Sequence, residues 1–184
     1  DLESFYKEVL ETVTDPKSIS LFYFVSAEAL FDRKMFPQAI FAYRKGAKSD
    51  HPMGNYLHGR YGQALQHEGL YEDALYQFEQ AQKPSEWMIF GDGAKNHAAY
   101  VNYCLGRVEK AKEMIEEIIA DKTDLPLTRW NYLLMMYHLD EDKQVINQYM
   151  NELRGWFPLS EGDEWIRFYG QEVKITQKIL ERND

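Results

Sequence analysis

Apolar side chains in the first fourteen residues recur at the spacing of one face of an α-helix. These positions are Leu2, Phe5, Tyr6, Val9, Leu10 and Val13. Asp15 followed by Pro16 is typical of a helix N-cap and first turn, so a second helix is predicted from there to about Asp32. No segment sustains the alternation of apolar and polar residues that a strand requires, and the pattern therefore predicts an all-helical chain.

A pattern of small and large residues then repeats along the chain, with Ala39, Ala74 and Ala111 placed 35 and 37 residues apart. The clearest copy, from Gly54 to Lys83, contains Tyr61, Gly62, Leu65, Gly69, Leu70, Tyr71, Ala74, Phe78 and Ala81. Gly62 and Ala74 are predicted where two antiparallel helices cross, because small side chains let the backbones approach. Gly69 is expected to end the first helix in the left-handed conformation.

This pattern resembles the tetratricopeptide repeat (TPR), apart from His58 at the first aromatic position. The resemblance implies an all-α, right-handed superhelical array of antiparallel helix pairs, with about three and a half to four units. A single array over residues 1–184 is predicted, in which Val145 and Asp140 make the fourth unit degenerate. Its segments are an N-terminal helix at 1–14, units at 18–51, 53–83, 92–122 and 126–157, and a capping helix at 160–182.

The first helix of each unit lines the concave groove of a TPR array, so the resemblance also predicts a binding surface. The groove positions are Leu21, Phe24, Glu28, Phe31, Tyr56, Gln63, His67, Asn96, Tyr100, Tyr103, Trp130, Leu134 and Tyr137. Some members of the family hold a terminal carboxylate with basic residues at these places. Here only Arg60 and Asn96 offer similar groups, and the aromatic, apolar lining instead favours an apolar or helical segment of a partner.

Composition narrows the possible partners. The net charge of -9 opposes binding to nucleic acid, and no run of residues is long and apolar enough to cross a bilayer. The single Cys104 cannot form an internal disulfide, which fits a reducing compartment, and a cytoplasmic location is expected. The chain begins with Asp1 rather than Met, so processing or truncation is one interpretation.

The sequence contains no motif typical of a catalytic or metal-binding site. The histidines His51, His58, His67, His97 and His138 have no metal-site spacing, and the acidic clusters Glu116-Glu117 and Asp140 to Asp142 lack the pattern of a calcium loop. Gly91 to Gly93 is interpreted as a loop before a helix, because it lacks the other elements of a phosphate loop. We therefore expect no catalytic residue, no metal and no cofactor.

The leading hypothesis is a scaffold or adaptor that binds another protein in its groove. Three alternatives remain: a homo-oligomeric structural module, which includes a homodimer, the regulatory TPR portion of a larger enzyme or signalling protein, and a sensor whose groove closes on a peptide. Trp130 and Tyr100 are the favoured anchor residues, because large amphipathic rings dominate binding hot spots.

Overall fold

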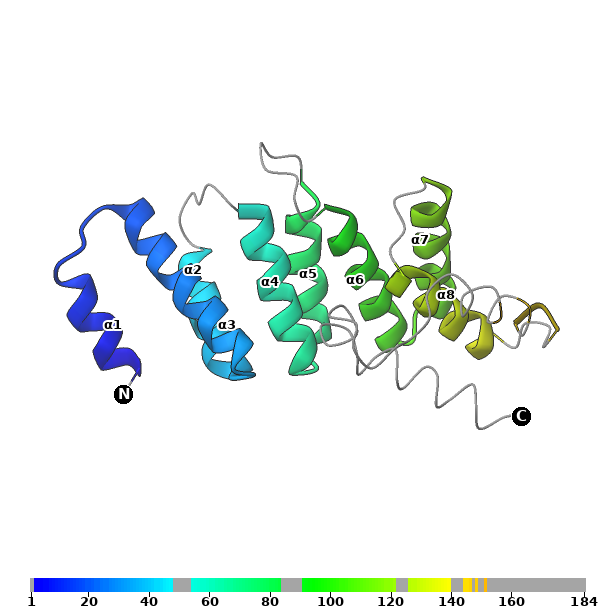
Figure 1. Ribbon diagram of the computed structural model, residues 1–184, viewed down its shortest axis with the longest axis horizontal. Coiled ribbons are helices and arrows are strands. Elements are labelled where there is room, and N and C mark those ends of the chain that lie inside the picture. The colour runs from blue at the N-terminus through cyan, green and yellow to red at the C-terminus, as the bar shows by residue number, and fades with distance from the viewer. Residues whose placement is uncertain are drawn as a thin grey trace. The chain divides into compact units, whose positions relative to one another are not determined.

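The computed structural model describes residues 2–47, 54–83, 91–121 and 126–139, together with 144–146, 148 and 151. These residues form helices and turns, and the described part of the chain contains no strand (Figure 1). Within the described residues, the helices with defined bounds are α1 (Leu2–Leu10), α2 (Pro16–Asp32), α3 (Phe36–Gly46), α4 (Gly54–His67), α5 (Tyr71–Ala81), α6 (Gly91–Cys104), α7 (Val108–Ala120) and α8 (Pro126–His138). The predicted all-helical fold is confirmed. None of the described helices is long and apolar enough to cross a membrane.

Side chains satisfy backbone groups at the start of α2 and at the end of α1. The carboxylate of Asp15 accepts a hydrogen bond from the Ser18 amide at 2.8 Å, which is the predicted N-cap of α2. Helix α1 ends at Leu10, earlier than the apolar pattern suggested. There the backbone amide and hydroxyl of Thr12 both donate to the Val9 carbonyl, at 3.1 and 2.7 Å, and close the helix with a tight turn.

Three helix pairs, α2–α3, α4–α5 and α6–α7, are joined by the same turn. A residue with positive φ follows the first helix in each pair: Lys34 at 59°, Gly69 at 73° and Gly106 at 77°. In each turn, the backbone amide of the residue after the positive-φ residue donates to the carbonyl five residues before it, at 2.9 Å. The amide of Leu70, for example, donates to the carbonyl of Leu65. This is the Schellman arrangement that ends a helix with a left-handed residue. The turn predicted at Gly69 is confirmed.

Small residues occupy the places where paired helices cross. The pairs Ala27 and Ala39, and Ala99 and Ala111, are buried in α2–α3 and α6–α7. In α4–α5, a Cβ placed on Gly62 would lie 2.6 to 2.9 Å from three ring atoms of Phe78, closer than real contacts allow. The ring of Phe78 therefore fills the space that the missing side chain leaves.

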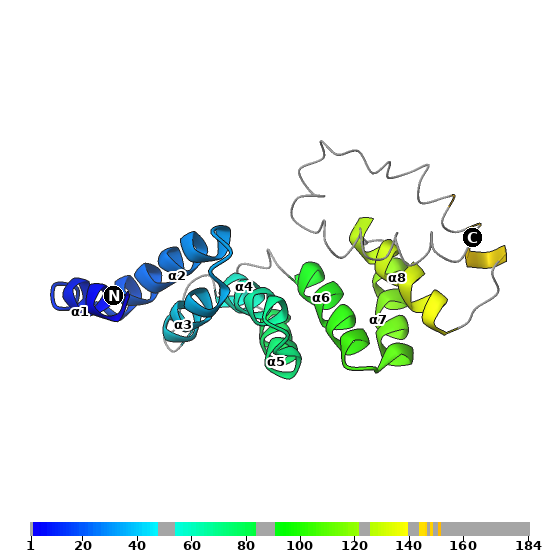
Figure 2. The same cartoon turned by 90° about the horizontal axis from the view of Figure 1, so that it is seen from below.

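The chain divides into two compact units between His97 and Ala98, within α6. In the first unit, α2 packs on α3, α4 packs on α5, and α3 lies against α4 (Figure 2). Tyr6 of α1 contacts the rings of Phe22, Tyr23 and Phe41 at centroid distances of 4.9 to 6.0 Å. This unit contains a network of charged and polar side chains between α2 and α4, which is the focus of the site described below.

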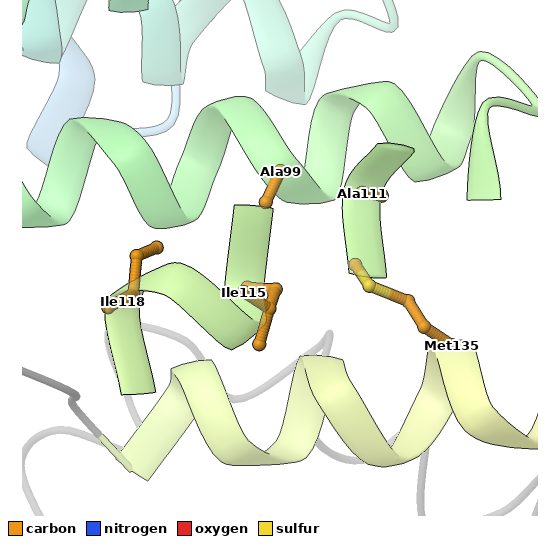
Figure 3. Close-up of a cluster of buried hydrophobic side chains, with 5 residues drawn as sticks. All are labelled: Ala99, Ala111, Ile115, Ile118 and Met135. Atoms are coloured by element: carbon orange, nitrogen blue, oxygen red, sulfur yellow. The ribbon is translucent and has the colours of Figure 1, made fainter. Parts of the chain in front are cut away.

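The second unit has its own apolar core between α6, α7 and α8. Figure 3 shows one buried cluster of this core, formed by Ala99, Ala111, Ile115, Ile118 and Met135. Tyr103, Val108, Met114, Ile119 and Tyr132 pack against it. The apolar positions of α7 recur every three or four residues, so the helix must bury one face.

One sequence interpretation is wrong, and others fall outside the described residues. Gly91 to Gly93 form the first turn of α6 rather than a loop. Glycine destabilises a helix mainly in its interior, through backbone conformational entropy, and these glycines lie at the helix end. The capping helix at 160–182 and most of the second half of the fourth unit lie outside the described residues. The repeat boundaries and the single-array organisation stay predictions.

Candidate functional site

One face of α2 carries both apolar and acidic side chains, most of them exposed. Leu21, Val25, Glu28 and Asp32 follow one another at helical spacing and therefore share a face. Leu21 and Val25 are exposed apolar residues, Asp32 is exposed, and Glu28 is partly covered. Glu28 is also the point at which α2 meets α4. We call Leu21, Val25, Glu28, Asp32, Tyr56 and Arg60 the α2–α4 strip.

The strip is organised by an ion pair between α2 and α4. The Nε of Arg60 donates to both carboxylate oxygens of Glu28, at 2.9 and 3.2 Å, and one terminal nitrogen lies 3.7 Å from Asp32. The Tyr43 hydroxyl donates to Glu28 as well. Burial, with the negative charge of Glu28 nearby, raises the pKa of both Tyr43 and Tyr56, so both hydroxyls stay protonated.

Aromatic rings hold the Arg60 guanidinium from the side. Its central carbon lies 3.9 Å from the centroid of the Phe31 ring, a cation–π contact. The imidazole of His67 meets Phe31 edge-on and stacks on Phe36 at a centroid distance of 4.3 Å. The ring of Tyr56 meets Phe24 edge-on at 5.8 Å. These contacts fix the orientation of the charged groups, so the strip is preorganised.

A chain of hydrogen bonds leads from Arg60 into the interior. Arg60 donates to the Oε1 of Gln63 at 3.0 Å, and the Nε2 of Gln63 lies 2.9 Å from the Nε2 of His97. Because an amide nitrogen can only donate, His97 accepts there, and its protonated Nδ1 donates to the Oε1 of Gln66 at 3.0 Å. The geometry therefore requires a neutral His97.

Burial agrees with that protonation state. The His97 ring is buried and stacks on Phe78 at a centroid distance of 5.2 Å. Desolvation, with the positive charges of His67 and Arg60 as smaller causes, lowers the pKa of His97 to about 4. At neutral pH, His97 is therefore a structural hydrogen-bonding group.

The structure brings some predicted groove residues together and removes others from the surface. Leu21 and His67 are exposed, Glu28, Phe31 and Tyr56 are half-buried, and all five belong to the first unit. Four residues are buried and do not form open surface: Phe24, Gln63, Asn96 and Leu134. For these four, interior packing and hydrogen bonding replace the predicted contact with a partner.

The remaining groove predictions fall in the second unit. Tyr100 and Tyr103 are half-buried, and the Tyr103 hydroxyl lies 2.9 Å from the Nδ1 of His138. The side chains of Trp130 and Tyr137 lie outside the described residues, although their backbone belongs to α8. Their role as partner anchors stays a prediction.

Sequence reasoning missed Val25 and Asp32 and assigned no role to the Arg60 network. The signal was present, because Val25 and Asp32 follow Leu21 at four and eleven residues on the same helical face. No group of three or more histidine, cysteine or carboxylate side chains is placed to hold a metal ion within the described residues.

Removing Arg60 should destabilise the protein because it leaves Glu28 without its cationic partner. For Arg60→Met we expect a loss of about 1–3 kcal/mol in the free energy of unfolding, below the value for fully buried pairs because Glu28 keeps some solvent contact. Adding Glu28→Gln should restore part of this loss. Urea unfolding followed by circular dichroism measures both changes.

The ion pair of Lys112 and Glu116, 3.8 Å apart on α7, supplies the control for that experiment. Lys112→Met should change the free energy of unfolding by less than about 0.5 kcal/mol, since solvent screens the pair. Equal effects of Arg60→Met and Lys112→Met would contradict a structural role for the α2–α4 pair.

Comparison with known proteins identifies the fold. No family model and no curated protein matches the chain. A crystal structure of a putative kinesin light chain from Podosopora anserina, with nearly identical TPR-like repeats, is similar with a TM-score of 0.65 and 16% identity, covering 84% of this chain and 82% of that one. A glutamine-to-methionine variant of it gives a TM-score of 0.67 at 15% identity, with the same coverage. At this identity, the likeness establishes a TPR-like repeat fold.

Proposed function

Taking the TPR-like repeat fold as the premise, we propose that the chain is a non-catalytic adaptor that binds a segment of a partner protein on the α2–α4 strip. TPR-like repeats generally mediate protein–protein interaction. The resemblance of the sequence to this repeat implies that the first helix of each pair supplies the binding surface. The segment is apolar or helical, and it covers Leu21 and Val25.

One observation carries this proposal. Among the described residues, Leu21 and Val25 are the only exposed large apolar side chains that lie one helical turn apart. Met35, Leu70 and Tyr76 are exposed singly, as is normal for a protein surface. The apolar pair shares its helical face with the carboxylates of Glu28 and Asp32, so an apolar anchor is combined with charged groups that can set orientation, as in other binding sites.

Replacing the apolar pair should weaken binding without loss of the fold. Covering two half-exposed side chains contributes roughly 1 kcal/mol each, so Leu21→Ser with Val25→Ser should weaken a partner about 30-fold. The test is quantitative affinity capture from lysate of the source organism, with the wild type and the double variant compared by mass spectrometry. A partner is expected with the wild type and should be depleted with the double variant.

Tyr76→Ser on α5 is the matched control, because it also removes one exposed apolar side chain. The partner should be recovered with this variant as with the wild type. Equal recovery with all three proteins would contradict binding at the strip. Light scattering across a concentration series tests the homo-oligomeric alternative, since a self-associating strip would give a dimer that the double variant lacks.

A further inference from the structure

We propose that the segment bound on the α2–α4 strip is basic as well as apolar, with a Lys or Arg side chain that pairs with Asp32. This inference rests on the proposed function and names the chemistry of the partner. The strip selects a cationic ligand and rejects an acidic one, although it contains the arginine that an acidic ligand would need.

The order of the charges from the surface inward supports this selectivity. The Asp32 side chain is 74% exposed and that of Glu28 is 25% exposed, whereas that of Arg60 is only 4% exposed. An approaching segment therefore meets carboxylates first. The positive charge lies beneath them, where a ligand can reach it only after the carboxylates move.

Arg60 is also engaged by groups that an acidic ligand would have to displace. Its Nε is bonded to Glu28 and one terminal nitrogen to Gln63, while Phe31 covers a face of the guanidinium. Displacing Glu28 would leave a partly buried carboxylate without its cation, which is unfavourable. A ligand carboxylate therefore gains no site here and is repelled by Asp32.

The position of Asp32 gives a separate argument. It is the last residue of α2, where the helix dipole disfavours a negative charge. Its distance of 3.7 Å from Arg60 and its high exposure make the pair between them weak. Folding gains little from a carboxylate at this position, so its contribution is to the surface that the strip presents.

The Arg33 charge, next to Asp32 in the sequence, does not cancel the Asp32 charge on this face. Arg33 donates to the Ala29 carbonyl at 2.8 Å, so its guanidinium folds back along α2. By helical spacing, Ala29 lies roughly 100° around the helix from Glu28. The Arg33 charge is therefore held to one side of the strip, while Lys34 lies in the turn that leads to α3.

The geometry also sets the spacing within the ligand. Val25 and Asp32 are seven residues apart on one helix, which corresponds to about 10 Å. A helical ligand spans this distance when its apolar and basic residues are seven positions apart. An extended ligand spans it with about three residues.

Two synthetic peptides provide the test. Each is an 18-residue, acetylated and fluorescently labelled helix with leucines on one face, and a single position seven residues from a leucine holds Lys in one peptide and Glu in the other. Fluorescence anisotropy measures the affinity of both for the full chain. We expect the Lys peptide to bind at least about fivefold more tightly, a preference that falls with added salt.

Variants separate the charge effect from the apolar contact. Asp32→Asn should reduce the preference for Lys to less than about twofold, whereas Asp73→Asn, at an exposed site on α5, should leave it unchanged. The Asp73 control excludes general attraction of a cationic peptide to a chain of net charge -9. Leu21→Ser with Val25→Ser should weaken both peptides.

The outcomes distinguish the two proposals. If both peptides bind equally and both are lost in the Leu21/Val25 variant, the strip binds apolar segments but the requirement for a basic residue is overturned. If the preference for Lys survives Asp32→Asn, the charge lies elsewhere and the inference is likewise overturned. If neither peptide binds, or both bind the Leu21/Val25 variant as well as the wild type, the proposed binding site itself is overturned.

Discussion

Replacing Phe78 by alanine is expected to lower the free energy of unfolding by about 3–5 kcal/mol, the range for deleting a buried aromatic ring. The side chain of Phe78 is fully buried in α5 and contacts two different groups. It fills the space at Gly62 and stacks on the His97 ring. The substitution therefore leaves a cavity and also uncovers one face of a buried imidazole.

The substitution Gly62→Ala should have opposite effects on stability in the wild type and in the Phe78→Ala variant. In the wild type, Gly62→Ala places a methyl group within 2.9 Å of the Phe78 ring, and overpacking of this kind costs about 1–3 kcal/mol. Alanine regains about 1 kcal/mol over glycine inside a helix, so the net loss is up to about 2 kcal/mol. With Phe78→Ala the ring is gone, and Gly62→Ala should then stabilise the protein by up to about 1 kcal/mol.

Urea unfolding of the four proteins in this cycle measures the coupling between the two positions. Phe78→Leu serves as a milder background if the alanine variant does not fold. Gly54→Ala is the control, because a Cβ at Gly54 meets nothing within 4 Å. If Gly62→Ala is destabilising by the same amount in both backgrounds, the close approach of α4 and α5 is not what requires glycine.

The same crossing explains why much of the fold could be predicted from the sequence. The buried residue pairs Ala27 and Ala39, Gly62 and Ala74, and Ala99 and Ala111 each have a separation of twelve residues. Each pair lies where two antiparallel helices cross, so the spacing of small residues in the sequence predicted which helices pack together. Glycine at position 69 likewise indicated where a left-handed turn falls, and Gly106 adopts a positive φ in the same way.

The first such turn shows the limit of this reasoning. Lys34 adopts a positive φ of 59° at the place where the other two turns have glycine. Nothing about lysine favours that conformation. The amides of Lys34 and Met35 donate to carbonyls of α2 at 2.8 and 2.9 Å, and these bonds offset the strain. The left-handed conformation of Lys34 is therefore determined by the connection between α2 and α3 and not by the identity of the residue.

The exposure of the groove positions was predicted less well, because exposure depends on neighbours from other repeats. Phe24 and Gln63 occupy groove positions, yet Tyr56 covers the first and Arg60 and His97 bond to the second. The bonds from Arg60 to Glu28 and from Gln63 to His97 join residues 32 and 34 positions apart. That separation is close to the repeat length, which is a signal that polar side chains of adjacent units meet.

The character of the surface changes as a result. The sequence suggested an aromatic, apolar lining. The structure instead has the ion pair of Glu28 and Arg60 at this place, surrounded by the rings of Phe31, Tyr43 and Tyr56. The Phe31 ring packs on the Arg60 guanidinium, and the protonated Tyr43 hydroxyl donates a hydrogen bond to Glu28. Within the α2–α4 strip, the side chains of Leu21, Val25 and Asp32 remain exposed.

Acidification should weaken the protein through His97 in a defined pH range. The pKa of His97 is about 4 in the folded protein and about 6.5 in an unfolded chain. Between these values the unfolded state binds a proton that the folded state does not, so stability falls as the pH is lowered from about 6.5 to 4. The difference corresponds to a loss of up to about 3 kcal/mol, which is complete below the folded pKa.

His97→Gln isolates this contribution, because it removes the titrating group but keeps polar atoms in the chain of hydrogen bonds. The free energy of unfolding is measured by urea titration at several pH values from 7.5 to 3.5. Carboxylates titrate in both proteins, so the difference between the two curves reports His97. The curve for His97→Gln should be flatter above pH 4, and parallel curves would contradict a neutral, buried histidine.

Protonation of His97 also conflicts with the bonds that Gln63 makes. A protonated Nε2 can no longer accept from the Gln63 amide nitrogen, so the amide would have to turn and offer its oxygen instead. Its nitrogen would then face the donor of Arg60, which needs an acceptor. The cost of charging His97 therefore includes the loss of a bond at Arg60, and Gln63→Leu, which removes this amide, should make the pH dependence in this range shallower than in the wild type.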